Sequence, residues 1–373
     1  MDAKKALYEF VPQVNEVIDS MLSKERKKSS NILSIVTDLL SATYEISQGG
    51  KRLRGAFVYY GYMMFGGEDL KEILKVSAFI ELIHNYLLVI DDIQDNSDLR
   101  HGKKTLHARY TEYYKDLILP IRKRRLKRHL HDYEFIGDPE HFGVSIGLLG
   151  GLILAHYAQL MFLDTKFDYD LKTKALEKLH RTIVDTAYGQ TVDIYGEKVG
   201  DVDEDYVLKV HKYKTGKYTY ENPLHVGAIL AGATENDLKA LTEYAIPGGI
   251  AFQIQDDILG MFGDEEKMGK SSDSDLKEGK WTLLIVKALE NGNQRQKRKL
   301  LNALGNKNLT KEDHEEVKKI IVDTGSFQYS KDLALKYVNK AKRALEKNYN
   351  PNWNREGYEF LIGVADYMIN REL

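Results

Sequence analysis

Apolar residues recur every three or four positions along most of this chain, which is the spacing of helices that bury one face. The longest such set lies in the first quarter of the chain and consists of Ile73, Val76, Phe79, Ile80, Ile83, Leu87 and Ile90. A second set runs from 171 to 179, whereas alternating patterns typical of strands are scarce. The six prolines leave long intervals in which nothing interrupts a helix. The pattern therefore predicts an all-α protein of ten or more helices.

No linker rich in proline or serine and no internal repeat divides the chain, so we expect a single domain over residues 1–373. One stretch, at about 111–141, differs from the rest because it is polar, aromatic and basic, with six Lys or Arg side chains between 122 and 128. We interpret it as a solvated helical insertion. RNA, anionic lipid or the acidic face of a partner are the alternatives for such a basic run.

Residues 144–163 carry no formal charge over a length that spans a bilayer. His156 and Gln159 within this stretch are costly in hydrocarbon, so we predict a buried core helix and no transmembrane segment. The N-terminal residues lack the apolar core of a secretion signal, which favours the cytoplasm.

Composition removes several classes of function. The 54 basic and 56 acidic side chains nearly cancel, so the chain lacks the global positive charge of a nucleic-acid partner. It also has no cysteine, which excludes disulfides, thiolate metal sites and a cysteine nucleophile. Any charged ligand must therefore be recognised locally.

The candidate chemistry begins where the apolar helix near residue 90 ends in aspartates. Asp91 and Asp95 lie one helical turn apart on the same face, and Asp92 stands beside them. Carboxylates without histidine or cysteine suit Mg²⁺, which is commonly shared with substrate phosphates. A second pair, Asp256 and Asp257, follows another apolar helical run. Two such pairs can face each other and hold metal ions, although either pair alone also fits an exposed helix end.

Cations that suit a phosphorylated ligand accompany both acidic pairs. Lys51 and Arg54 of the GGKRLR segment are three residues apart and can share a helical face. Further candidates are Arg100, Lys103, Lys104, Lys214, Lys217, Lys270 and Lys280. No GxxxxGK[ST] or GxGxxG loop supports a nucleotide fold. Acids, cations and a helical scaffold together point to diphosphate leaving groups and carbocations.

The ordered motifs of the chain resemble those of the trans-isoprenyl diphosphate synthases, the polyprenyl synthetase family. The matching segments, in chain order, are GGKRLR, HNYLLVIDDIQDNSDLRHGKKT, YGQTVD, KYKTG, FQIQDDILGMFGD, MGKSSDSDLKEGKWT and DYMINREL. This order over the whole chain, apart from 111–141, is far more specific than one DDxxD motif. The resemblance implies one polyprenyl synthetase domain, an isoprenoid synthase-like bundle around a central cavity.

The resemblance also implies a reaction, the head-to-tail 1′-4 condensation of isopentenyl diphosphate with an allylic diphosphate. The allylic diphosphate ionises, the double bond of isopentenyl diphosphate attacks the cation, and a proton passes to the released diphosphate. The enzyme would be a Mg²⁺-dependent prenyltransferase, with three ions per site, working as a homodimer. Short-chain products are implied, geranylgeranyl diphosphate first among them.

Individual roles follow from the family pattern. The implied Mg²⁺ ligands are Asp91, Asp95 and Asp256, with Asp92, Asp257 and Asp193 as nearby or water-mediated partners. The implied substrate-binding residues are Arg100, Lys214 and Lys270 for the allylic diphosphate, Lys51, Arg54 and His84 for isopentenyl diphosphate, and His101 and Lys280 beside them. The oxygen atoms that would face the developing cation belong to Thr215, Gln190 and Gln253.

Four positions depart from the family pattern. Gly55 replaces a proline, Gly151 replaces the aspartate of a GD pair, and Gly260 makes the second acidic motif DDILG, which removes its last acid. His101 stands where an arginine normally follows Arg100, which weakens the expected grip on isopentenyl diphosphate at neutral pH.

Product length is expected to depend on Tyr86, five residues before Asp91, and on Leu87 beside it. Five helical residues rise about 7.5 Å, so a bulky side chain there can form the floor of the cavity into which the tail grows. The resemblance suggests that an aromatic residue at this place favours the geranylgeranyl product over farnesyl diphosphate. Plain packing of Tyr86 in the core is the alternative.

Three other readings of the whole chain stay open. A farnesyl diphosphate synthase differs only in product length. A terpene cyclase would leave GGKRLR without a role and would carry an NSE-type second metal motif, which the sequence lacks. A non-catalytic regulatory subunit would be expected to lose acids, but both aspartate motifs retain theirs. The preferred allylic primer and the role of the insertion stay open.

Overall fold

The computed structural model describes residues 2–29, 31–100, 102–127, 137–264 and 272–369. Contacts within the chain divide it into two compact units. The first unit comprises Met1–Phe10, Arg52–Ile73 and Lys166–Leu373, and the second comprises Val11–Lys51 and Leu74–Thr165. Helices make up nearly all of the described chain, which confirms the predicted all-α fold of more than ten helices. The strands in the described ranges are β1 (Leu99–Arg100) and β2 (Lys103–Lys104), a short hairpin.

The second unit contains most of α1 (Ala3–Ser29) and α4 (Leu70–Gln94), together with α2 (Ser34–Ile46), α5 (Leu106–Tyr113), the π-helical segment η1 (Tyr114–Ile118), α6 (Leu119–Lys127) and α7 (Pro139–Leu163). Its core joins side chains from α2, α4 and α5, among them Leu39, Val89 and Tyr110. The Tyr110 hydroxyl donates a hydrogen bond to Asp38 at 2.6 Å, which satisfies this buried polar group. The acidic end of α4 is thereby fixed on a packed helical support.

Helix α7 packs closely on one side and is exposed on the other. It starts at Pro139 after the N-cap Asp138, whose side chain accepts a hydrogen bond from the His141 backbone N–H. Its buried face carries glycines, so α7 approaches α4 and α5 closely. Its other face exposes the leucines Leu148, Leu149, Leu152, Leu160 and Leu163. The prediction of a buried core helix is therefore wrong for this face, because no described element covers it.

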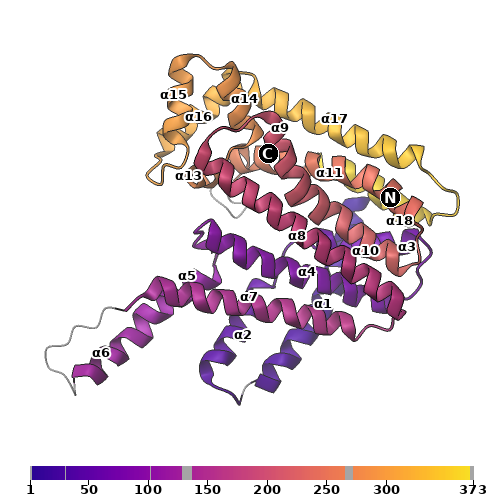
Figure 1. Ribbon diagram of the computed structural model, residues 1–373, viewed down its shortest axis with the longest axis horizontal. Helices are drawn as coiled ribbons and strands as arrows, with labels where there is room; N and C mark the ends of the chain where they lie inside the picture. The colour runs from indigo at the N-terminus through magenta and orange to yellow at the C-terminus, as the bar shows by residue number, and fades with distance from the viewer. Residues whose placement is uncertain (1, 30, 101, 128–136, 265–271, 370–373) are drawn as a thin grey trace. The chain divides into compact units, whose positions relative to one another are not determined.

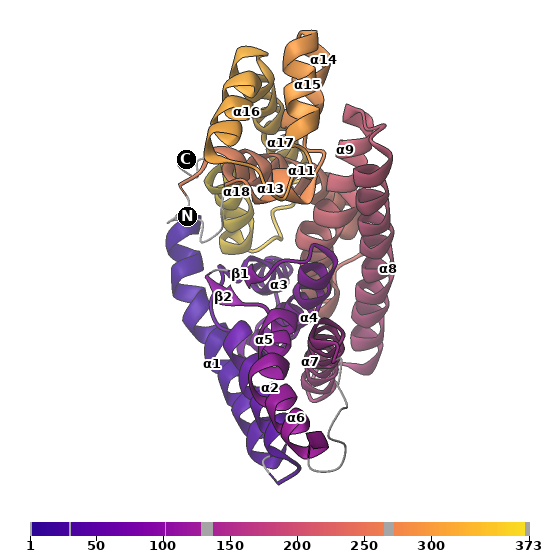
Figure 2. The ribbon, with the colours of Figure 1, turned by 90° about the vertical axis from the view of Figure 1, so that its left-hand side faces the viewer.

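The first unit holds the remaining helices: α3 (Leu53–Met64), α8 (Tyr169–Val199), α9 (Glu204–Val210), the π-helical segment η2 (His211–Glu221), α10 (Asn222–Leu230), α11 (Glu235–Phe262), α13 (Ser274–Glu278), α14 (Leu283–Asn291), α15 (Gln294–Ala303), α16 (Lys311–Asp323), α17 (Ser326–Lys347) and α18 (Arg355–Ile369). Figure 2 shows α14, α15 and α16 grouped beside α17. Helix α11 begins with a capping box between Thr234 and Asp237. Ile254 and Ile258 of α11 pack into the main apolar cluster of this unit.

The basic stretch predicted as an insertion begins inside packed structure. Tyr114 is buried, and its ring lies 5.2 Å from the ring of Phe142. Beyond it, α6 leads away from α5 and α7 (Figure 1) and exposes Arg122, Lys123 and Arg124. Residues 128–136 lie outside the described ranges. A single domain with an inserted segment at 111–141 stays a prediction.

Two described helices, Leu70–Gln94 and Pro139–Leu163, are long and apolar enough to cross a membrane by length and composition alone. Core helices of globular proteins pass the same test. Of the most apolar window, 61% is buried in the first helix and 39% in the second. The first is therefore explained by its place in the core, and the second keeps an exposed apolar face.

Candidate active site

The first acidic motif lies at the C-terminal end of α4, in the second unit. The side chains of Asp91 and Asp92 are 25% and 7% exposed, so one faces solvent and the other is buried. The helix closes with a hydrogen bond from the Asp95 N–H to the Asp91 carbonyl at 2.8 Å. Asn96 then adopts a positive φ of 53°, which turns the chain out of the helix.

Arg100 returns to these aspartates from strand β1. Its Nε donates to Asp92 Oδ1 at 2.6 Å, and its Nη2 donates to Asp91 Oδ2 at 3.4 Å. The return is held by Thr105, whose N–H donates to the Asp98 carbonyl at 3.0 Å and whose hydroxyl donates to the Ser97 carbonyl at 2.9 Å. The loop and hairpin after the motif therefore deliver a guanidinium to the carboxylates, and the predicted role of Arg100 toward an allylic diphosphate stays a prediction.

Electrostatics in this motif favour a further cation. Burial raises the pKa of Asp92 to about 6, Arg100 opposes the rise, and the negative charges of Asp91 and Asp95 add to it. Burial is the largest cause of this rise, and the neighbouring carboxylates add to it.

Oxygen donors of this kind fit Mg²⁺, which takes one or two carboxylates and completes its shell with water and substrate phosphates. In the described ranges no three acidic or histidine side chains converge closely enough to enclose a metal ion by themselves.

The other predicted residues of this unit lie on or near the same helix. His84, Asp91 and Asp95 are seven and four residues apart, which places them on one face of α4. Tyr86 and Leu87 are both half-buried on α4. Leu87, three residues after His84 and four before Asp91, shares this face, whereas Tyr86 does not. Lys51 is exposed at the end of the GGKRLR turn, where Gly49 and Gly50 adopt φ values of 87° and 86° that glycine alone tolerates readily.

A second group of predicted residues gathers in the first unit around η2. This π-helical segment carries Lys214 and Thr215, and π-helical turns are frequent at functional sites. Lys214 Nζ donates to Asp193 Oδ2 of α8 at 3.1 Å. Thr215 Oγ1 donates to Gln253 Oε1 of α11 at 2.5 Å. The structure thus brings together four residues that the sequence separates by up to sixty positions.

The second acidic pair continues this network on α11. Gln253 Nε2 donates to Asp257 Oδ1 at 2.9 Å, and His211 Nε2 lies 3.2 Å from Asp257 Oδ2. Asp257 and His211 are both buried, at 8% and 5% exposure. Asp256 is half-buried, one residue earlier on the helix. Asp257 is therefore tied into the protein, while Asp256 is the member of the pair better able to reach a ligand.

The last position of the DDILG motif, Gly260, lies next to an acidic side chain of α13. A methyl group built on Gly260 would lie 2.7 Å from Oδ2 of Asp275 on α13. The Asp275 carboxylate therefore occupies the place where a side chain at 260 would begin, one helical turn after Asp256. The structure therefore places a carboxylate of α13 beside the last position of the second motif.

The remaining predicted side chains are placed as follows. Arg54 of α3 donates from Nη2 to Thr219 Oγ1 at 2.7 Å, while its buried Nε has no hydrogen-bond partner in the described ranges. Gln190 is half-buried on α8, and Lys280 lies 2.6 Å from Glu278. His101 and Lys270 lie outside the described residues. The two acidic motifs belong to different units, so their approach to one another stays a prediction.

Sequence reasoning missed two residues, His211 and Asp275. His211 is three residues before Lys214 in η2, and Asp275 lies within the matched segment MGKSSDSDLKEGKWT. Only the packing of η2 and α13 against α11 shows that both reach the second motif. The signal in the sequence was their place within or directly beside matched segments, since His211 immediately precedes KYKTG and Asp275 lies inside MGKSSDSDLKEGKWT.

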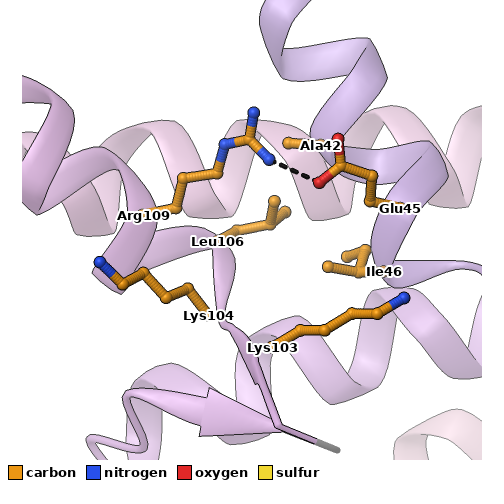
Figure 3. A pocket seen from close by; sticks show the side chains of 7 residues that line it. All are labelled: Ala42, Glu45, Ile46, Lys103, Lys104, Leu106 and Arg109. Atoms are coloured by element: carbon orange, nitrogen blue, oxygen red, sulfur yellow. Dashed lines mark hydrogen bonds and ion pairs between the residues drawn. The ribbon is translucent and has the colours of Figure 1, made fainter.

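A cavity of about 400 Å³ lies beside the hairpin in the second unit, lined by Ala42, Glu45, Ile46, Lys103, Lys104, Leu106 and Arg109 (Figure 3). Arg109 donates to Glu45 at 2.8 Å and to Asp38 at 3.2 Å, and Lys104 pairs with Glu112. Carboxylates thus neutralise two of its three cations. Lys103 and Lys104 are sequence candidates for a phosphorylated ligand, but the residues that the resemblance assigns to substrate do not line this cavity. We assign no ligand to it.

Comparisons with known proteins agree with this arrangement. The family model described as polyprenyl synthetase matches residues 38–323, which run through both units. A short chain isoprenyl diphosphate synthase of Methanocaldococcus jannaschii is 32% identical over 86% of this chain and 85% of its own length. A geranylgeranyl diphosphate synthase of Saccharolobus solfataricus is 34% identical, with 87% of each chain covered.

Solved structures show the same fold. A geranylgeranyl pyrophosphate synthase from Corynebacterium glutamicum, complexed with isoprenyl diphosphate and magnesium, has a TM-score of 0.87 at 27% identity, covering 98% of this chain and 99% of that chain. The geranylgeranyl pyrophosphate synthetase of Pyrococcus horikoshii has a TM-score of 0.76 at 26% identity, covering 99% and 98%.

Proposed function

This chain belongs to the polyprenyl synthetase family, and from that premise we propose that it is a short-chain prenyl diphosphate synthase. It would catalyse the head-to-tail 1′-4 condensation of isopentenyl diphosphate with allylic diphosphates. The observation that supports this best is the network of Lys214, Thr215, Gln253 and Asp257, which brings a cation, neutral oxygen atoms and a carboxylate together. Relatives named as geranylgeranyl and short chain isoprenyl diphosphate synthases support the same activity.

The residues of each motif would divide the work. Arg100, Lys214 and Lys270 would bind the allylic diphosphate, and Lys51, Arg54, His84 and His101 would bind isopentenyl diphosphate. When bound, Mg²⁺ supplies positive charge that stabilises the negative charge growing on the leaving diphosphate. Asp91, Asp95 and Asp256 would hold it, with Asp92, Asp193, Asp257 and Asp275 around them. Three ions per site is the number that we propose.

The cation formed by ionisation needs oxygen atoms near it and water kept away. Thr215 and Gln253 already form a hydrogen-bonded pair at 2.5 Å, so their oxygen atoms are fixed before substrate arrives. Gln190 of α8 would add a third. The proton lost after condensation would pass to the released diphosphate, so no side chain has to act as general base.

Homodimerisation is part of the proposal. Leu148, Leu152 and Leu160 of α7 are 47–58% exposed on one face of a helix that is otherwise apolar. Contiguous exposed leucines of this kind mark protein interfaces. A second copy of the chain would cover this face. A cytoplasmic location, expected from the N-terminal sequence, belongs to the same proposal.

The product that we propose is geranylgeranyl diphosphate, because Tyr86 stands five residues before Asp91 as a candidate cavity floor. Purified protein incubated with isopentenyl diphosphate, Mg²⁺ and each of dimethylallyl, geranyl and farnesyl diphosphate should yield the twenty-carbon product, identified by mass. Farnesyl diphosphate as the end product would correct the length only. Cyclic hydrocarbons would identify a terpene cyclase, and no turnover with any primer would contradict the proposal.

A further inference from the structure

Gly151 lies in the middle of α7, on the face that packs against α4. A methyl group built on it would stand 3.3 Å from Cδ2 of Tyr86 and 3.4–3.5 Å from Val89. The distance to Tyr86 is tighter than most real contacts of a Cβ atom, whereas those to Val89 are ordinary van der Waals contacts, so a side chain at 151 displaces the Tyr86 ring by a few tenths of an ångström. The Tyr86 ring therefore uses space that only a glycine at 151 leaves open.

Of the two neighbours, Tyr86 is the one able to move. Val89 is 3% exposed, and its branched side chain has little rotamer freedom in a helix. Tyr86 is half-buried, and in the described part of the chain its hydroxyl makes no hydrogen bond and its ring has no aromatic partner. Packing alone sets its position, and Gly151 is part of that packing.

We propose that Gly151 is a positioning residue for product length, because it lets the Tyr86 ring lean toward α7 and so deepens the space in which the prenyl tail grows. The inference rests on the proposed function and deepens it. A side chain at 151 would push the ring away from α7 and into that space. The chain should then stop growing earlier, so products become shorter.

The test is the ratio of twenty-carbon to fifteen-carbon products made by Gly151→Ala. We expect this ratio to fall roughly tenfold, the lower end of what a methyl-sized change achieves in an apolar pocket. Gly151→Val should lower it further. The ratio reports on where growth stops, and a loss of folded protein lowers both products together without changing it.

Gly147→Ala is the matched control. Gly147 lies one turn earlier on α7, and a methyl group there would also meet its nearest neighbour at 3.3 Å. That neighbour is His107 of α5, not Tyr86. The control therefore carries the same crowding on the same helix and should leave the product ratio unchanged. An equal shift in both variants would overturn the proposal.

A double variant tests the route through Tyr86. In a Tyr86→Ala background the ring is gone, so Gly151→Ala should no longer change the ratio. A shift of the same size with and without the ring would show that Gly151 does not act through Tyr86.

A second double variant serves if Gly151→Ala folds poorly. The Gly151→Ala, Val89→Ala protein removes the contact with Val89 and keeps the contact with Tyr86. Its reference is Val89→Ala alone, relative to which the ratio should again fall.

The two proposals fail in different ways. A wild-type protein that makes no prenyl diphosphate from any primer overturns the proposed function, and this inference with it. A wild-type protein that elongates normally, with a Gly151→Ala ratio within twofold of its own, overturns only the role of Gly151.

Discussion

The two acidic motifs have similar sequences but different surroundings. Asp91, Asp92 and Asp95 end a helix, and the cation that pairs with them, Arg100, comes from the loop and hairpin directly after it. Asp256 and Asp257 lie inside α11, where His211 of η2 and Gln253 of the same helix hold Asp257. The first motif is completed by residues nearby in the sequence. The second is completed by other helices.

This difference bears on which motif tolerates change. In a complete DDxxD motif followed by an arginine, the aspartates and the cation that pairs with them come from one short segment of the chain. A motif that has lost its last acid, as at Gly260, depends on a carboxylate from elsewhere, and Asp275 lies in that place. Substitutions in the first motif should therefore remove function outright, whereas those around the second should weaken metal binding by degrees.

The largest effect is expected for the first motif. Asp91→Ala or Asp95→Ala should lower kcat/KM by roughly three orders of magnitude, because no other nearby cluster provides two carboxylates one turn apart. Steady-state kinetics at saturating Mg²⁺ measures this, with circular dichroism to confirm folding. Asp201→Ala, an exposed acid outside both motifs, is the control. Near-normal turnover of either motif variant would show that the metal site is wrongly placed.

The second motif should respond through metal affinity. Chelation by EDTA should stop condensation and added Mg²⁺ should restore it. Asp275→Ala should raise the Mg²⁺ concentration for half-maximal rate roughly tenfold, as loss of an outer partner of a metal site does. Mg²⁺ should also raise the melting temperature of the complex with an allylic diphosphate. The Mg²⁺ concentration for half of this rise should increase by the same factor in Asp275→Ala.

Asp273→Ala controls for the segment of Asp275. Asp273 is two residues away and pairs with Lys277 at 2.7 Å. Its loss should leave the Mg²⁺ requirement of both measurements unchanged. Equal responses of the two variants would mean that Asp275 contributes only to local structure.

The residues ahead of the motifs also differ. Five residues before Asp91 stands Tyr86, and five residues before Asp256 stands the small, buried Ala251. Tyr86→Ala puts an alanine five residues before both motifs. It should lengthen the products beyond twenty carbons, because the side chain proposed as the floor of the cavity is removed. Mass analysis of the products after exhaustive elongation measures this, and an unchanged product distribution would leave Tyr86 as a packing residue only. Tyr188→Ala, an exposed tyrosine of α8, is the control.

The smallest effect on catalysis is expected from a buried network outside both motifs. Glu221 accepts hydrogen bonds from Lys178 at 2.9 Å and from Thr242 at 2.7 Å, and Thr242 Oγ1 lies 3.1 Å from His225 Nε2. The pKa of His225 is lowered to about 4. Burial is the largest cause and Lys178 adds to it, whereas Glu221 and the Leu238 carbonyl oppose the lowering. His225 is therefore neutral in the folded protein at pH 7.

Stability should fall as the pH drops, because the unfolded histidine takes up its proton near pH 6.5 and the folded one only near pH 4. The free energy of unfolding by urea should decrease by roughly 2 kcal/mol between pH 7 and pH 5 on account of this group. Burial raises the pKa of Glu221 and Lys178 lowers it, and the net effect is a lowering. The contribution of Glu221 to the free energy of unfolding is therefore lost only at still lower pH. His225→Gln should remove the loss between pH 7 and pH 5, and an equal slope in both proteins would contradict it.

By itself the sequence determined the helical class, the helix that carries the first motif and the candidate arginine that follows it. Periodicity and short-range spacing act within one or two turns, so Asp91, Asp95 and Arg100 were readable without a fold. The family resemblance extended this to Lys214, Thr215, Gln253 and Asp193. Their ordered motifs identify roles that spacing alone does not.

Tertiary structure decided what depends on close packing between segments far apart in the sequence. The carboxylate of Asp275 beside Gly260, the contact of His211 with Asp257 and the Tyr86 ring over Gly151 are such contacts. It also decided that α7 exposes its leucines, although its composition predicts burial on every side. An apolar composition predicts that a helix packs against other elements. Only the positions of its neighbours in space show which faces receive it within the chain.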